Sequence, residues 1–180
     1  MFQVTAPQSS EDWQDYYQLR WQVLRAPWEQ PRGSEQDDLE QESEHRFIKN
    51  NEGDVLAVAR LHFNTQQQAQ VRYMAVSEQH RGQRLGGRLL HELEKLAWNQ
   101  NADELVLYAR ERALAFYEGH GYKVVEKAHL AFGDIQHWKM VKQNPSEPGW
   151  FRHPDWTQVL QDTWRESIPI SDAMGIKVES

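Results

Sequence analysis

The run from His80 to Arg88 reads His-Arg-Gly-Gln-Arg-Leu-Gly-Gly-Arg, and its residue types and spacing suit phosphate binding. Residues 69–76 before it are β-branched and aromatic enough for a strand, and residues 89–97 after it have helical periodicity. A glycine-rich turn between a strand and a helix leaves backbone N–H groups unpaired at the positive end of the helix dipole. The run therefore predicts a socket for a pyrophosphate-bearing ligand, and ordinary glycines at a helix start are the alternative interpretation.

Charge and composition exclude several other kinds of site. Three arginines, Arg81, Arg84 and Arg88, lie in or beside the turn of a chain whose net charge is -7. This acidic balance argues against general nucleic-acid binding, which needs a basic surface. The chain has no cysteine, so a disulfide, a thiolate metal site and a cysteine nucleophile are excluded. Its eight histidines show no ligand spacing such as His-Glu-x-x-His, so we expect no metal site.

The length of 180 residues suits one domain of ordinary size with an appendage. The residues from Met1 to Pro7 lack the basic start and apolar run of a secretory signal. No stretch approaches the length of a membrane span, so we expect a cytoplasmic protein without a membrane partner.

The elements that must position the run follow from hydrophobic periodicity and from turn residues. We expect a short strand at residues 2–5 and a helix from Ser9 or Ser10 to about Arg25. The acidic segment 35–44 is expected to be a short helix with a solvated face. Further strands are expected at 46–49, 55–63, 69–76 and 104–109, helices at 85–97 and 113–121, and a closing hairpin at 122–126 and 137–141.

Two motifs resemble those of the GNAT N-acetyltransferases. Residues 81–86, Arg-Gly-Gln-Arg-Leu-Gly, resemble the acyl-CoA loop of that family, Arg/Gln-x-x-Gly-x-Gly/Ala. Residues 113–122 resemble its second signature, a helix carrying Ala-x-x-x-Tyr before a glycine–aromatic pair. The resemblance covers residues 2–142 and has two departures. Arg84 replaces a glycine, which a helical backbone would tolerate, and Arg110 stands where an asparagine is often found.

The resemblance implies a fold, a reaction and a set of site residues. The implied fold is α/β (α+β), with a central mixed, mostly antiparallel sheet flanked by about four helices. The implied reaction moves an acetyl group from acetyl-CoA to an amine, on a small molecule or on a protein N-terminus or lysine, by direct attack and without a metal. Tyr117 would be the general acid that protonates the leaving thiolate. The implied acetyl-CoA contacts are Met74, Ala75, Val76, Arg81, Gly82, Gln83, Arg84, Leu85, Gly86, Gly87 and Arg88.

Two features of the acceptor side stay open. The base that removes the amine proton could be Glu111, His62, His45 or Tyr73, or a chain of water molecules. Three arginines flank the loop of residues 27–31, which borders the acceptor pocket in this family. They could bind an acidic group on the acceptor, and surface solvation is the alternative for at least two of them. These three are Arg20, Arg25 and Arg32.

Residues 145–180 lie outside the acetyltransferase pattern, so we expect an acetyltransferase domain at 1–144 and a helical extension at 145–180. Trp156, Leu160 and Trp164 share one face of the expected helix. The extension resembles the start of a hotdog-fold, thioesterase-like module that follows a GNAT domain in some bacterial bifunctional proteins. Its tryptophan face could pack on a second copy, giving a homodimer. Acyl transfer in acyl-carrier or fatty-acid thioester metabolism and a non-catalytic acyl-CoA sensor are the alternative functions.

Overall fold

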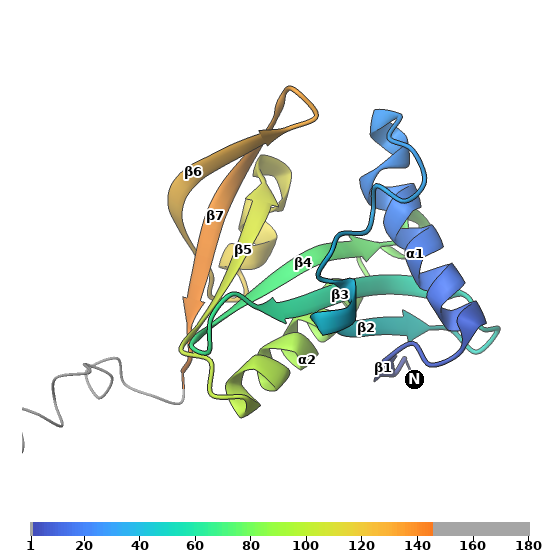
Figure 1. The fold of residues 1–180 in the computed structure, drawn as a ribbon, viewed down its shortest axis with the longest axis horizontal. Helices are drawn as coiled ribbons and strands as arrows, with labels where there is room; N and C mark the ends of the chain where they lie inside the picture. The colour runs from blue at the N-terminus through green and yellow to red at the C-terminus, as the bar shows by residue number, and fades with distance from the viewer. Residues whose placement is uncertain (1, 146–180) are drawn as a thin grey trace, which may run out of the picture. The chain divides into compact units, whose positions relative to one another are not determined.

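A computed structural model of the chain describes residues 2–145, which form one mixed sheet with helices on both faces (Figure 1). The seven strands lie in the order β1-β2-β3-β4-β5-β7-β6. The α-helices of the described residues are α1 (Ser10–Leu24), α2 (Leu85–Asn99) and α3 (Leu114–Glu118). The strands are β1 (Val4–Thr5), β2 (Glu44–Lys49), β3 (Val55–Phe63), β4 (Gln68–Val76), β5 (Glu104–Arg110), β6 (Lys123–Ala131) and β7 (Ile135–Gln143).

The sheet opens between β4 and β5, which pair over only part of their length. These two strands are parallel and pair only between residues 68–70 and 104–106, whereas every other neighbouring pair is antiparallel. Beyond Gln70 and Val106 the two strands separate, as Figure 1 shows. The backbone groups of β4 that face β5 are therefore free of a sheet partner along the second half of the strand.

The two faces of the sheet carry separate cores. On one face α1 packs Tyr16 and Leu19 against Phe47, Val58 and Ala75. On the other face α2 buries the leucines of its apolar stripe, and each contributes about 1.5–3 kcal/mol of stability. These leucines are Leu85, Leu89, Leu90 and Leu93.

Apart from the helix expected at 35–44, the order of strands and helices predicted from the sequence is confirmed over the described residues, with the mixed, mostly antiparallel sheet. The boundaries of β6 and β7 were predicted too short, because their ends carry polar residues that suit a loop equally well. Three α-helices, not about four, lie within residues 2–145. The expected C-terminal helix lies outside the described residues.

The acidic segment is the main correction to the predicted elements. Its only helical part is a 3-10 turn at Glu40–Glu42, the remaining residues are turns and irregular backbone, and Glu44 already belongs to β2. Glu35 is 3% exposed, so the segment is not simply a solvated face. Two of its carboxylates, Asp37 and Glu40, instead pair with buried arginines of α1 and β3.

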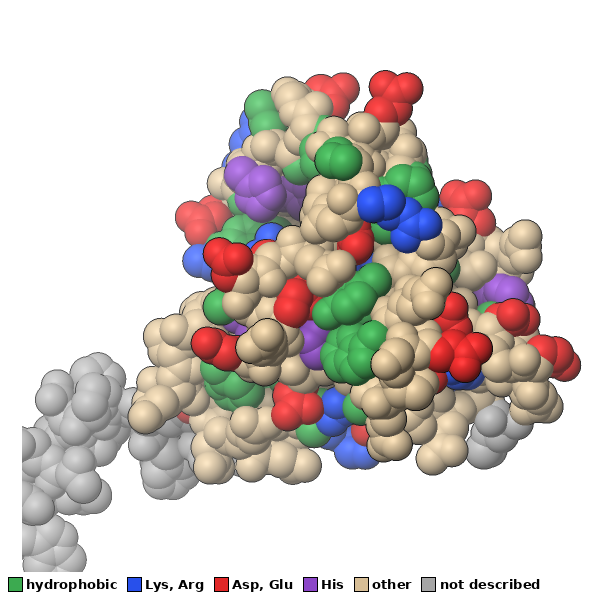
Figure 2. All heavy atoms as spheres, turned by 45° about the vertical axis from the view of Figure 1, so that its right-hand side comes forward, with side chains coloured by type: hydrophobic (Ala, Val, Ile, Leu, Met, Phe, Trp, Pro, Cys, Tyr) green, Lys and Arg blue, Asp and Glu red, His purple; other side chains and the backbone are tan. Residues whose placement is uncertain are grey.

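No helix among the described residues is both long enough and apolar enough to cross a membrane. Asp and Glu side chains are spread over the face of the molecule drawn in Figure 2, in keeping with the acidic balance of the chain.

Candidate active site

A cavity of about 1580 Å³ lies where β4 and β5 separate. At one end it reaches the loop between β4 and α2, where residues 80–82 and 84–88 line it. At the other end it reaches the C-terminal end of α1 and the β6–β7 hairpin, where residues 23–25 and 131–132 line it. The cavity therefore connects the loop before α2 with the region between the end of α1 and the β6–β7 hairpin.

The loop before α2 presents a row of unpaired amides. Within residues 2–145, none of the backbone N–H groups of residues 82–87 donates a hydrogen bond in a turn or helix cap. The first amide of α2 that does so is that of Arg88, which donates to the carbonyl of Arg84 (3.2 Å). Gly82 has a φ of 82°, a left-handed value that favours glycine. The amides lie at the N-terminus of a 15-residue helix, whose dipole adds positive potential.

Arg84 does not have the helical backbone that the sequence analysis required. It is the N-cap of α2 with φ 60° and ψ 17°, in the left-handed region. A residue with a Cβ pays about 1–2 kcal/mol there, which gives a physical reason for a glycine at this position in the motif. The arginine side chain nevertheless lines the cavity.

Two glycines of the same loop allow α3 to lie close to α2. A Cβ on Gly86 would lie 3.4 Å from Cζ of Phe116, and one on Gly87 would lie 2.8 Å from Nε2 of His120. The glycines of this turn therefore allow close packing and also leave the backbone amides exposed. Because α3 packs against them, its Tyr117 reaches the cavity.

A β-bulge in β4 shapes the middle of the cavity. The pairing with β3 shifts between Val58 and Arg60, so that Tyr73 and Met74 together face Ala59. Tyr73 has a φ of 54°, which turns the strand at this point. Met74, Ala75 and Val76, predicted as acetyl-CoA contacts, line the cavity at and after the bulge.

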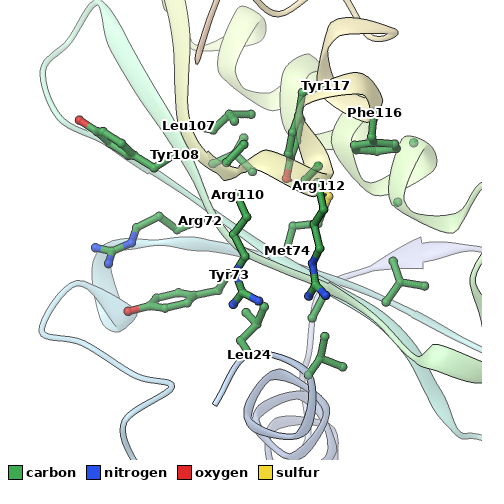
Figure 3. Close-up of a pocket in the computed structure, with 18 of the residues that line it drawn as sticks. Leu24, Arg72, Tyr73, Met74, Leu107, Tyr108, Arg110, Arg112, Phe116 and Tyr117 are labelled. Carbon is green, nitrogen blue, oxygen red and sulfur yellow. Dashed lines mark hydrogen bonds between the residues drawn. The ribbon is translucent and has the colours of Figure 1, made fainter. Parts of the chain in front are cut away.

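Tyr117 points from α3 toward Met74, as Figure 3 shows. Its hydroxyl lies 3.7 Å from Sδ of Met74, a weak partner, and both residues line the cavity. Burial raises the pKa of the Tyr117 phenol to about 12. The phenol is therefore a proton donor throughout the neutral range, with little holding its hydroxyl in place.

The acidic segment neutralises two arginines that are fully buried on the α1 face of the sheet. Arg20 lies 2.8 Å from Oε1 of Glu40, and Arg60 lies between Glu40 and Asp37. Burial alone would raise the pKa of Asp37, but the hydrogen bonds from Arg60, from the Leu39 amide and from Tyr73 hold it well below its usual range. This segment is thus fixed on the sheet beside Tyr73.

Most of the residues considered as a general base lie elsewhere. Glu111, His62 and His45 are not among the residues that line the cavity, and only Tyr73 is. His45 is buried between the Tyr16 hydroxyl (3.1 Å) and the carbonyl of Glu40 (2.8 Å). The Tyr73 hydroxyl donates to Asp37 at 3.1 Å, and burial raises its pKa. None of the four combines access to the cavity with a free basic atom.

Similarity to known proteins agrees with this arrangement. Residues 13–122 match the model of the Acetyltransferase (GNAT) family, which covers more than half of the chain. The chain belongs to the GNAT family. A relative in Bacillus subtilis (strain 168), the uncharacterized N-acetyltransferase YjcF, is 30% identical over 134 residues, 74% of this chain and 94% of that protein.

Solved structures share the GNAT fold at lower identity. An acyl-CoA N-acyltransferase from Pseudomonas aeruginosa matches with a TM-score of 0.67 and 23% identity, covering 79% of this chain and 98% of that one. An aminoglycoside 6'-N-acetyltransferase complexed with coenzyme A matches with a TM-score of 0.68 and 16% identity, covering 82% and 99%. The GNAT family uses acetyl-CoA and acts on amine acceptors.

The end of the cavity near α1 and the β6–β7 hairpin contains two histidines and a tyrosine that the sequence did not single out. Tyr108 and Arg110 of β5 lie beside two histidines from the closing hairpin, His129 and His137, whose rings stack 4.8 Å apart. The histidines were missed because only the register of β7 on β5, which pairs His137 with Arg110, brings them to the site.

The three arginines expected around the loop after α1 have different environments. Arg25 lines the cavity. Arg20 is buried in ion pairs, and Arg32 is exposed and stacks 4.2 Å above the Trp21 ring, so neither of these two lines it. Arg72, not singled out from the sequence, does line the cavity.

No group of three or more His, Cys, Asp or Glu side chains within residues 2–145 is arranged to hold a metal ion.

Proposed function

We propose that this GNAT protein is an N-acetyltransferase that moves the acetyl group of acetyl-CoA to an amine by direct attack. The observation that carries the proposal is the row of free amides at residues 82–87, which opens into the same cavity as the Tyr117 hydroxyl. Acetyl-CoA supplies an activated thioester, so the chain itself needs no nucleophile.

The loop of residues 81–88 would bind the pyrophosphate of the donor. Its free amides and the α2 dipole suit an anion, and Arg81, Arg84 and Arg88 line the cavity beside them. A Cβ on Gly87 would meet the His120 ring, which would have to move. The space beside the loop amides therefore depends on glycine at this position. The residues present therefore fit a diphosphate.

The residues after the β4 bulge would hold the thioester. Backbone N–H groups of residues 74–76 have no β5 partner, because the strands have separated there. A fixed N–H that points at the carbonyl oxygen stabilises the negative charge that develops on it during attack. The bulge at Tyr73 would set the direction of these groups.

Tyr117 would then donate a hydrogen bond or a proton to the departing sulfur. With a pKa of about 12 the phenol keeps its proton at neutral pH, as an acid must. Met74 is the only partner of its hydroxyl within the described residues, and a sulfur atom holds it weakly enough to be replaced by the donor's sulfur.

His137 would accept the proton of the attacking amine. Its Nδ1 lies 3.0 Å from the carbonyl of Ile135, which can only accept, so Nδ1 carries the hydrogen and Nε2 keeps its lone pair. Burial, followed by the charges of His129 and nearby arginines, lowers the pKa of His137. The ring is therefore neutral and basic at pH 7.

Two measurements test the proposal. Acetyl-CoA should raise the melting temperature of the full chain, because a ligand that binds only the folded state stabilises it. Free CoA should then be released with at least one member of a panel of primary amines. Stabilisation by acetyl-CoA without CoA release in the presence of any amine would favour the acyl-CoA sensor. Turnover of acyl-carrier thioesters without an amine would favour a role in fatty-acid metabolism.

The domain boundary at residue 144, the homodimer and the cytoplasmic location stay predictions. The resemblance of residues 145–180 to a thioesterase-like module lies outside the described residues.

A further inference from the structure

The charged side chains that line the cavity are all basic. Seven arginines and five histidines line it, and none of the described lining residues is Asp or Glu. The chain as a whole carries a net charge of -7. Three of these arginines lie beside the loop before α2. Another three, Arg25, Arg72 and Arg110, lie at the acceptor end and are called the acceptor-side arginines below.

Among the acceptor-side arginines, only Arg72 pairs with a carboxylate of the described residues. Arg25 donates to the backbone carbonyls of Ser34 (2.8 Å) and Leu24 (2.9 Å). Arg72 lies 3.2 Å from Asp37, which also pairs with the buried Arg60. Arg110 has a buried Nη1 with no hydrogen-bond partner within residues 2–145.

Aromatic faces hold these guanidinium groups toward the cavity. The guanidinium carbon of Arg110 lies 4.0 Å from the centroid of Trp28, and that of Arg25 lies 5.3 Å from Phe132. Trp28 and Phe132 in turn stack 6.0 Å apart, which joins the loop after α1 to the β6–β7 hairpin. Such faces orient a guanidinium without neutralising its charge, so its donors stay available to a ligand.

Burial and mutual repulsion make this cluster costly without an anion. Burial lowers the pKa of Arg25. Burial and the charges of Arg112 and Arg25 lower the pKa of Arg110 to about 10. Both groups stay charged at neutral pH, and two like charges held out of water favour the arrival of a negative group.

The acyl donor does not supply that negative group. Along β5, Leu107 and Ala109 belong to the core around α2, and Tyr108 and Arg110 alternate with them and point to the opposite face. The phosphates of the donor belong at the α2 end of the cavity, and its pantetheine arm carries no charge. In Figure 3, Arg110 and Arg112 extend toward Leu24 at the end of α1, away from Tyr117.

Resting on the proposed function, we infer that the acceptor is an amine that also carries an acidic oxygen group, a carboxylate or a phosphate, bound by the acceptor-side arginines. Guanidinium groups match such oxygens with paired N–H donors. Attack forms the new N–C bond, the amine proton passes to His137, and the C–S bond breaks to release the CoA thiolate, which takes a proton from Tyr117. The same positive surroundings lower the pKa of the bound amine, which favours its neutral, nucleophilic form.

The test compares acceptors that differ only in the acidic group. CoA release by the full chain is measured with an α-amino acid against its carboxamide, and with phosphoethanolamine against ethanolamine. We expect kcat/KM to be at least tenfold higher for the acidic member of one pair, and the pair that responds distinguishes carboxylate from phosphate. Equal rates within both pairs would overturn the inference and leave the proposed acetyl transfer intact.

Variants connect the preference to the arginines. Arg110→Gln should reduce the ratio of acidic to neutral acceptor at least fivefold. Arg32→Gln is the matched control, because Arg32 is an exposed arginine of the segment after α1 that does not line the cavity, and it should leave the ratio unchanged. A ratio that survives Arg110→Gln, and also Arg25→Gln, contradicts the inference.

A binding measurement decides the matter if no amine of the panel reacts. Acetate and inorganic phosphate are titrated into the CoA-saturated chain while the arginine Nε–H resonances are followed by NMR. We expect shifts in resonances that disappear in Arg25→Gln and Arg110→Gln. Shifts no larger than that of Arg32 would overturn the inference, whereas failure of the chain to bind CoA at all would contradict the proposed function instead.

Discussion

The Tyr117 hydroxyl, the proposed proton donor to the leaving sulfur, makes little contact with the rest of the fold. Its hydroxyl has one weak contact, to Met74 Sδ at 3.7 Å, while its ring packs against Phe116 and Tyr122. A phenylalanine would keep the ring contacts and remove only the donor. The effects on chemistry and on stability can therefore be separated at this position.

We expect Tyr117→Phe to lower kcat for acetyl transfer by about 10²-fold or more, the usual contribution of a positioned acid. The free energy of unfolding should change by less than about 1 kcal/mol, because a single weak hydrogen bond is lost. Stopped-flow detection of CoA and thermal unfolding measure the two effects. Tyr122→Phe is the matched control: it removes a hydroxyl from a ring 5.9 Å away that does not line the cavity, so kcat should change little.

The pH dependence of kcat should reflect the shifted groups. Tyr117 must be protonated to act, and burial raises its pKa to about 12, so kcat should show no loss between pH 7 and pH 10. His137 must be neutral to act, and burial lowers its pKa from the ordinary histidine range, so kcat should fall only in more acidic solution than an ordinary histidine would require. A fall near pH 10 would contradict the assignment of Tyr117.

Replacing His137 tests the acidic part of that profile. His137→Gln should lower kcat by about 10²-fold at pH 7 and should remove the acidic fall, because no group then titrates there. The control is His120→Gln, a cavity histidine whose Nδ1 donates to the Phe116 carbonyl near the α2 loop, and it should keep the fall. An unchanged profile in His137→Gln would assign the proton to another acceptor, such as water.

At the scale of elements, the segment around Asp37 and Glu40 fixes the α1 face of the sheet. Both carboxylates reach Arg60, which is fully buried on β3, and Glu40 also reaches Arg20 on α1. Asp37 further receives the Tyr73 hydroxyl at the bulge. The segment therefore links α1, β3 and the bulge that shapes the cavity.

Asp37→Asn should lower the free energy of unfolding by on the order of 2–3 kcal/mol at pH 7, because Arg60 loses charged hydrogen bonds. The pKa of Asp37 is lowered in the folded state, so its contribution is fully present above the ordinary value of 3.8 and is lost as the pH falls toward the folded value. Denaturation by urea at several pH values should show the difference from wild type narrowing in acid. Asp38→Asn, which changes an exposed neighbour, should show no such loss.

The elements also show which parts of the structure a sequence can predict. The strand before residues 80–88 and the helix after them are local patterns, and both elements are confirmed. Arg60 and its carboxylate partners are 20 and 23 residues apart, so nothing local predicts their pairing. His137 reaches the site only because β7 lies between β5 and β6, a strand order that spacing along the chain does not determine.

At the scale of the whole molecule, the described residues separate their charges. Acidic side chains are spread over the face seen in Figure 2, and the chain has a net charge of -7. The cavity, by contrast, is lined by arginine and histidine without a carboxylate among its described residues. A basic cleft in an acidic body concentrates anionic ligands at one place and repels them elsewhere, so the field favours productive encounter.

This separation predicts that the use of acetyl-CoA depends on ionic strength. Between about 0.05 and 0.5 M NaCl the Debye length falls from roughly 14 to 4 Å, so the attraction of the cavity for a polyanion is largely screened. We expect KM for acetyl-CoA to rise several-fold over this range while kcat and the melting temperature change little. Acetyl-dephospho-CoA, which lacks one phosphate, should show a smaller rise. A KM that does not change with salt would mean that the basic lining binds its ligands by contact geometry alone and that the field of the molecule contributes nothing to their capture.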